Sequence, residues 1–456
     1  MIRLIYYQFN RSKKQWLGIS PVIFISSLVV GLAFNGYLNV AINSQVFLGL
    51  PDPKPIFLFP IVFGGVTLFF VISTLISMLV QTFREDYNLL EILGASRFHL
   101  SFLVGGQIFI ISTIVSIVGY ICSLPVTINY YHFLQHFFGK NILPDIQFRM
   151  SILGFVSTVL LISFLTFLSG CYYSLKSMKH KIISPFRKKI RLVRKAMLLC
   201  FIFFIWGTIL IQIFRVQSIL TKAQMIFNLV IFNMAVIYQI SPYIQGGAIK
   251  LLSKVIFRKR YMYIFSKWNL LFNNSYIKSI SASAIGIITL ISSFQMISQN
   301  ILARFQDNGD LELKVAFIVY VGAPILIVLA NIMSIAILSL EQEKNEIKQL
   351  ELLGASNFQM VMIKLGESIF LTTVISLLSL LLNIVIMLLI AYCLKEDSLL
   401  RSFNYSGLFL SNIIISIMLF TVLFLSKSAY FIIKNIRDNI IKLLANSNKK
   451  VYNGDG

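Results

Sequence analysis

The chain has 456 residues, of which 57% are hydrophobic and 12% are charged. This composition leaves too little polar surface to cover a folded chain in water, so it excludes a soluble globular protein and favours one embedded in a bilayer. The formal net charge of +23 fits a nucleic-acid binder or a membrane protein with basic loops on one side. The positions of the basic residues distinguish these two classes.

Ten apolar runs approach the length of about 20 residues that a helix needs to cross the hydrocarbon core. They lie near 16–40, 56–82, 101–126, 150–175, 196–214, 224–248, 279–299, 315–340, 365–394 and 406–430. The basic start before the first run is typical of a signal peptide, but the apolar part is too long, and we interpret it as a retained anchor. We therefore expect an all-α integral membrane protein with about ten transmembrane helices.

The basic residues are unevenly distributed between these spans. With the amino terminus in the cytoplasm, 31 of the 40 Lys and Arg residues lie on the cytoplasmic side. This asymmetry predicts a multi-pass protein of the cell membrane with both termini in the cytoplasm. Anionic membrane lipid is the expected partner of the charge, and the basic run at 179–195 is interpreted as a topogenic loop rather than a nucleic-acid site.

The order of the spans repeats along the chain. The first four begin and end in the cytoplasm, the next two make one excursion, and the last four follow the pattern of the first four. Two parallel four-helix repeats joined by a helix pair predict a pseudo-two-fold axis along the membrane normal. We expect a first unit at 1–178, a basic linker with a two-span hairpin at 179–260, a second unit at 261–440 and a polar tail at 441–456.

A nine-residue stretch occurs almost unchanged in both units, as LEILGASRF at 90–98 and LELLGASNF at 350–358. Each copy lies in the cytoplasmic connection between the second and third spans of its unit. Apolar residues recur every three positions before the glycine and predict the stripe of a short amphipathic helix. The stripe consists of Tyr87, Leu90 and Leu93 in the first copy and of Ile347, Leu350 and Leu353 in the second. Glu91 and Glu351 lie on another face.

The glycine and the serine of the stretch suit a helix that stops and restarts. Gly94 and Gly354 stand where a helix end adopts the left-handed conformation, which glycine reaches at low cost. Ser96 and Ser356 suit the N-cap of the next helix, and Gln359 completes a capping box in the second copy. A simple surface turn explains these residues. It does not require the same glutamate and apolar stripe twice, so we favour a docking element for a soluble partner.

The longer stretches EDYNLLEILGASRFHLSFLVGGQ and EKNEIKQLELLGASNFQMVMIKLGE resemble the signature of FtsX-like permease domains. In that family a charged helix, a Leu-Gly-Ala-Ser turn and a following glutamate link the second and third spans. Glu367 matches that glutamate in the second copy, whereas Gln107 stands there in the first. Two such units with a central span pair resemble the ten-span permease subunits of bacitracin-resistance and lantibiotic-resistance ABC transporters, and the resemblance covers over half of the chain.

The resemblance implies a permease subunit in the bacterial plasma membrane that couples a separate ABC ATPase, with two ATPase subunits expected, to movement or release of a peptide or lipid-like substrate. Antimicrobial-peptide resistance is the implied role. The residues of the two stripes, their glutamates, glycines and serines, and Glu367 are the implied ATPase-coupling residues. The permeases carry a large extracellular domain between spans seven and eight, whereas the connection here, at 299–314, is short. This departure weakens the substrate assignment.

The energy source and the chemistry must then lie in a partner. The sequence contains no GxxxxGK[ST] motif, since Gly139-Lys140 is followed by Asn, so we expect neither an enzyme nor a bound nucleotide cofactor. Glu367 near a cytoplasmic end is alternatively an interfacial charge or a partner of Lys364. A non-transporting transmitter that couples an ATPase to a cell-wall hydrolase or a sensor kinase is the alternative function. Few intramembrane carboxylates disfavour a secondary transporter.

Metal binding is not expected. His132 and His136 are four residues apart and could share a helical face, but no third ligand is evident nearby. The four cysteines have spacings that match neither a zinc site nor a disulfide framework, so we interpret them as small core residues. They are Cys122, Cys171, Cys200 and Cys393.

Overall fold

The computed structural model describes residues 7, 9–10, 16–47, 53–82, 89–141, 143–177, 185–216, 219–255, 261–272, 274–300, 322–335, 337–339, 349–393, 403–425 and 427–428. Within these ranges all regular secondary structure is helical. The tail predicted at 441–456 and all but the start of the connection at 299–314 lie outside the described residues.

The helices follow one another through short connections. In chain order they are η1 (Leu17–Ile19), α2 (Ser20–Ile42), η2 (Ser44–Phe47), α3 (Lys54–Thr82), α5 (Arg97–Phe138), α6 (Ile152–Ser177), α7 (Pro185–Arg215), α8 (Ile219–Val255), α9 (Tyr261–Phe272), α10 (Asn274–Asn300) and α12 (Asn357–Cys393). Two further helices cover Gly322–Ser339 and Ser406–Leu425. Short helical segments at 89–92 and 349–352 precede α5 and α12.

Within the described residues, seven helices are long and apolar enough to cross a membrane. They are Leu17–Ile42, Arg97–His136, Ile152–Tyr172, Ile280–Asn300, Gly322–Ser339, Asn357–Tyr392 and Ser406–Leu425. Helices suit this environment because their backbone N–H and C=O groups pair within the segment, where lipid offers no partner. The other predicted runs lie within the helices α3, α7 and α8. The prediction of an all-α membrane-spanning protein is confirmed, and the count of ten spans in two repeats stays a prediction.

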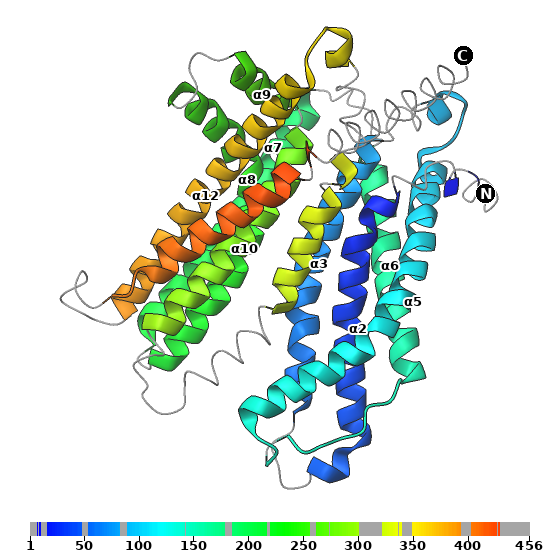
Figure 1. Cartoon of the computed structure of the whole chain (residues 1–456), viewed down its shortest axis with the longest axis vertical. Helices are drawn as coiled ribbons and strands as arrows, with labels where there is room; N and C mark the ends of the chain where they lie inside the picture. Colours follow the sequence, from blue (N-terminus) through cyan, green and yellow to red (C-terminus); the bar gives the residue numbers. More distant parts are fainter. Residues whose placement is uncertain are drawn as a thin grey trace, which may run out of the picture.

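Two groups of helices lie side by side, one with α2, α3, α5 and α6 and the other with α8, α10 and α12 (Figure 1). The helix at Gly322–Ser339 lies beside α3 although it follows α10 in sequence. A Cβ added to Gly64 of α3 would lie 3.4 Å from the Cβ of Ala323, and one added to Gly18 only 2.6 Å from Leu338 Cδ2. Small residues allow such close packing of membrane helices, so this helix and α3 join the two groups.

An asparagine near the end of one helix in each group holds the chain before a later helix. In α2, Asn39 Nδ2 donates to the carbonyl of Arg149 at 3.0 Å, and Asn39 Oδ1 accepts from the Arg149 N–H at 2.9 Å. In α10, Asn300 Nδ2 donates to the carbonyl of Asn404 at 3.1 Å, and Asn300 Oδ1 accepts from the Asn404 N–H at 2.7 Å. The same two-bond contact therefore fixes the approach to α6 and to the helix at Ser406–Leu425.

One end of the first group is closed by an aromatic cluster. The 42 residues of α5 would extend about 63 Å, twice the hydrocarbon thickness of about 30 Å. Beyond Pro125 the helix runs across the end of the group (Figure 1). There Tyr131 stacks on Phe57 of α3 with ring centroids 6.5 Å apart, and its hydroxyl donates to the carbonyl of Pro144 at 2.6 Å. This end lies opposite the two repeated turns (Figure 1).

Candidate functional site

Both copies of the repeated stretch end a short helix with the same hydrogen-bonded glycine turn. Gly94 and Gly354 have positive φ angles of 95° and 84°. In each copy the glycine N–H donates three residues back and the following alanine N–H donates five residues back, which is the Schellman pattern. The bonds are Gly94 to Glu91 (3.0 Å), Ala95 to Leu90 (3.0 Å), Gly354 to Glu351 (2.9 Å) and Ala355 to Leu350 (3.0 Å). The predicted left-handed glycine is confirmed in both copies.

The helix after each turn begins on the predicted serine. Ser96 Oγ accepts from the His99 N–H at 3.3 Å. In the second copy Ser356 Oγ accepts from the Gln359 N–H at 3.3 Å, and Gln359 Oε1 accepts from the Ser356 N–H at 3.0 Å. The reciprocal capping box predicted for the second copy is therefore confirmed. Each turn joins its short helix firmly to the membrane-spanning helix that follows.

The turn divides the predicted apolar stripe between two sides. Leu90 and Ala95 pack against the main hydrophobic core, and Leu350 and Ala355 pack with the buried Met360. An inward contact between these two positions commonly accompanies a Schellman turn. The leucine just before each glycine points away from the core instead. The stripe is therefore not one face, and its members Tyr87 and Ile347 lie outside the described residues.

Each turn exposes three large apolar side chains at matching positions, between 66% and 88% exposed. We name Ile92, Leu93 and Phe98 the first apolar patch, and Leu352, Leu353 and Phe358 the second apolar patch. Both turns lie at the same end of the molecule (Figure 1). Leaving such a side chain in water forgoes about 1.5–3 kcal/mol relative to burying it. Of these residues only the two leucines before the glycines were predicted as site residues. The shared apolar residues at the other positions were the signal for the rest.

The two copies differ in charge beside the patch. Glu91 Oε1 lies 2.9 Å from Arg97 Nε, and both side chains are partly exposed. Asn357 stands at the position of Arg97 in the second copy, so Glu351 cannot form the same pair. An exposed pair of this kind contributes at most about 1 kcal/mol. The apolar patches are thus duplicated more closely than the charges around them.

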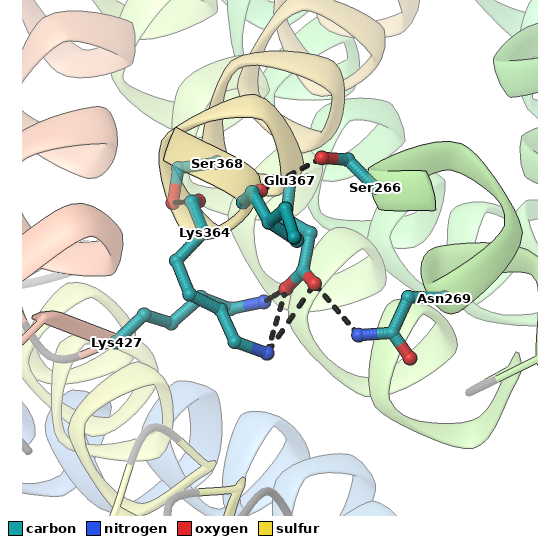
Figure 2. A network of polar contacts seen from close by, with 7 residues as sticks. Ser266, Asn269, Lys364, Glu367, Ser368 and Lys427 are labelled. Atoms are coloured by element: carbon teal, nitrogen blue, oxygen red, sulfur yellow. Dashed lines mark hydrogen bonds and ion pairs between the residues drawn. The ribbon is translucent and has the colours of Figure 1, made fainter. Parts of the chain in front are cut away.

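Glu367 lies in a buried polar network inside α12, away from the apolar patches (Figure 2). Lys364 Nζ lies 3.3 Å from Glu367 Oε1, and Lys427 Nζ donates to Glu367 Oε2. Asn269 of α9 donates from Nδ2 to Glu367 Oε1 at 2.7 Å. The predicted alternative of a Lys364 partner is confirmed, and a snorkelling interfacial charge is excluded because Glu367 is buried. Lys427 and Asn269 were not predicted.

The first copy replaces this charged network by neutral residues. Gln107 stands at the position of Glu367 and Val104 at that of Lys364. Gln107 is buried, and its Nε2 has no hydrogen-bond partner among the described residues. An unpaired buried amide destabilises its surroundings by about 1–3 kcal/mol. The two halves therefore differ most at this level of the membrane-spanning helices.

The described residues contain no group of three His, Cys, Asp or Glu side chains that could hold a metal ion. His132 Nδ1 lies 3.3 Å from the Gln135 Oε1 of the next turn. Cys122 and Cys171 are half-buried and Cys200 is exposed, and none of the three forms a disulfide. Comparison of the chain with protein-family models, with curated proteins and with solved structures finds no match.

Proposed function

We propose that the chain is the permease subunit of an ABC transporter, in which the two apolar patches dock onto separately encoded ATPase subunits. The duplicated patch is the observation that carries the proposal. Two turns with the same Schellman geometry place three apolar side chains each at one end of the molecule. A soluble partner with two equivalent sites would cover both patches, and a pair of ATPase subunits meets that requirement.

The proposed architecture has ten spans in two parallel four-helix repeats joined by the α7–α8 pair, with both termini in the cytoplasm of a bacterial cell. Two observations support the repeat beyond the turns. Asn39 and Asn300 make the same two-bond contact with the chain before a later helix. The basic residues also cluster on the side where both turns are expected.

The geometry suits the transmission of movement. In each copy the docking turn is joined by a capping serine to a long helix, α5 or α12, that enters the membrane. Closure of two ATPase subunits would move both turns together and shift the population between two packings of the helices. A peptide or lipid-like substrate at the outer leaflet is the proposed cargo, with antimicrobial-peptide resistance as the role.

The short connection at 299–314 favours the second candidate, a transmitter that couples an ATPase to a cell-wall hydrolase or a sensor kinase without transport. It leaves little extracellular chain between those spans to hold a substrate. The two candidates differ in one measurable property. A transporter predicts that ATP hydrolysis by the reconstituted complex rises with substrate, whereas a transmitter predicts that it responds to the hydrolase or the kinase alone.

Native mass spectrometry of the complex purified from its source membranes in mild detergent tests the docking claim shared by both candidates. The expected mass corresponds to one copy of this chain with two ATPase subunits, because both patches lie in one chain. A stable complex with two copies of this chain for each ATPase pair, or a chain that carries no ATPase, would contradict the proposal.

A further inference from the structure

The amphipathic helix α9 has an apolar outer face that no described part of the chain covers. Ile264, Phe265 and Trp268 are between 42% and 63% exposed, whereas Ser266 and Leu270 on the opposite side are buried. A cation accompanies the largest of these side chains, since Lys267 Nζ lies 5.8 Å from the centroid of the Trp268 ring. An aromatic side chain next to a basic one is typical of membrane–water interfaces.

The inner face of α9 fixes its depth in the membrane. Ser266 Oγ donates to the carbonyl of Ile363 at 2.8 Å, and Asn269 Nδ2 donates to Glu367 Oε1 at 2.7 Å. A Cβ added to Gly366 would lie 2.7 Å from Ser266 Oγ, so the two helices are in close contact. The α12 residues concerned stand near the start of the membrane-spanning helix, at the end that carries the repeated turns (Figure 1).

The length of α12 places this contact at the interface. The apolar part of α12 has 36 residues and would extend about 54 Å, so about 24 Å exceeds a hydrocarbon core of about 30 Å. Its first turns therefore reach the headgroup region, and α9 lies beside them. At that depth the outer face of α9 meets lipid headgroups and the upper acyl chains rather than bulk water.

We propose that the outer face of α9, formed by Ile264, Phe265 and Trp268, is a docking surface for the anionic lipid surface of the membrane. Charge complementarity favours an anionic surface. Arg258, Lys259 and Arg260 directly precede α9 in sequence, and Lys267 lies within it. Each basic residue near an anionic leaflet strengthens binding by about 1 kcal/mol. The lipid surface thereby also holds Asn269 against Glu367. This inference does not depend on an ATPase partner.

Quenching of tryptophan fluorescence by brominated lipids tests the proposal in the full chain reconstituted in nanodiscs. Bromines close to the headgroup should quench the wild-type chain, and Trp268→Phe should lose most of that quenching. Trp206→Phe is the matched control and should retain it, because Trp206 is half-buried and donates to Asn233 within the helix pair. At equal mole fraction, brominated phosphatidylglycerol should quench Trp268 more strongly than brominated phosphatidylcholine, and high salt should remove the difference.

Three results would overturn the proposal. Trp268 fluorescence that is quenched by aqueous iodide but not by lipid bromines would place the face in water. Iodide quenching that disappears when cytosolic protein is added would assign the face to a protein partner. Equal quenching by the two brominated lipids at low salt would remove the anionic specificity. A monodisperse elution profile of each variant, compared with that of the wild type, verifies that it has folded.

Discussion

Replacement of Gly354 by valine tests whether the turn itself couples the chain to its partner. Gly354 has a φ of 84°, and an added Cβ would find nothing within 4 Å. The cost of Gly354→Val is therefore backbone strain without a clash. For an L-residue in the left-handed region this strain is about 1–2 kcal/mol, and the β-branch of valine adds to it. Such a difference changes a two-state population by a factor of about 5–30.

The strain acts on the turn and not on the spans. Relief of the strained φ breaks the hydrogen bonds of Gly354 and Ala355 to Glu351 and Leu350 and displaces the second apolar patch. The packing of α12 is unaffected, so the variant should accumulate in the membrane at the normal level. ATP hydrolysis by the complex reconstituted in proteoliposomes should fall about 5–30-fold if only the native turn docks.

Gly354→Asn is the matched control, because asparagine tolerates positive φ better than any other residue with a side chain of this kind. It should retain most of the stimulated hydrolysis, and Gly94→Val should reproduce the loss if both patches are engaged. Equal, wild-type activity of the valine and asparagine variants at normal abundance would show that the repeated stretch is only a turn. The docking proposal would then lose its main support.

Three further predictions concern the buried network, the topology and the outer loop. Glu367→Gln leaves a buried ammonium without its carboxylate and should lower the free energy of unfolding by about 3–5 kcal/mol in an SDS titration; an unchanged midpoint would show that the network contributes no stability. In a cysteine-free background Lys188→Cys should be protected from an impermeant maleimide and Asp310→Cys labelled, and the reverse pattern would contradict the topology. Hydrogen bonding from Lys140 holds the pKa of Asp145 below its usual range, so the contribution of this contact is present above the unfolded pKa and is lost as pH falls through the folded pKa. Hydrogen exchange in the loop should therefore increase at acid pH, and Asp145→Asn should abolish that dependence.

Local features of the site could be predicted from the sequence because they depend on neighbouring residues. The left-handed glycines and the capping box of Ser356 and Gln359 each involve residues within a few positions of one another. The outward direction of Ile92 and Phe98 could not be predicted from spacing alone. A period of three assigns one stripe to a continuous helix, whereas the Schellman turn ends the helix inside the pattern.

Contacts between distant parts of the chain could not be predicted for a different reason. Glu367 meets Lys427, 60 positions away, and Asn269, 98 positions away. Nothing in an apolar span shows which of its neighbours lies beside it until the helices are packed. The same holds for Asn39, whose partner Arg149 is 110 positions away. Polar residues within apolar runs indicate that partners exist, but they do not identify them.

Photocrosslinking from the apolar patches tests the central claim most directly. A benzophenone amino acid placed at Leu353 or Leu93 in the native membrane should crosslink to an ATPase that carries a Walker motif. The same group at Leu350, which packs inward in the same turn, should not. Crosslinks from Leu353 and Leu93 to lipid or to this chain alone, with the ATPase absent from both, would contradict the account.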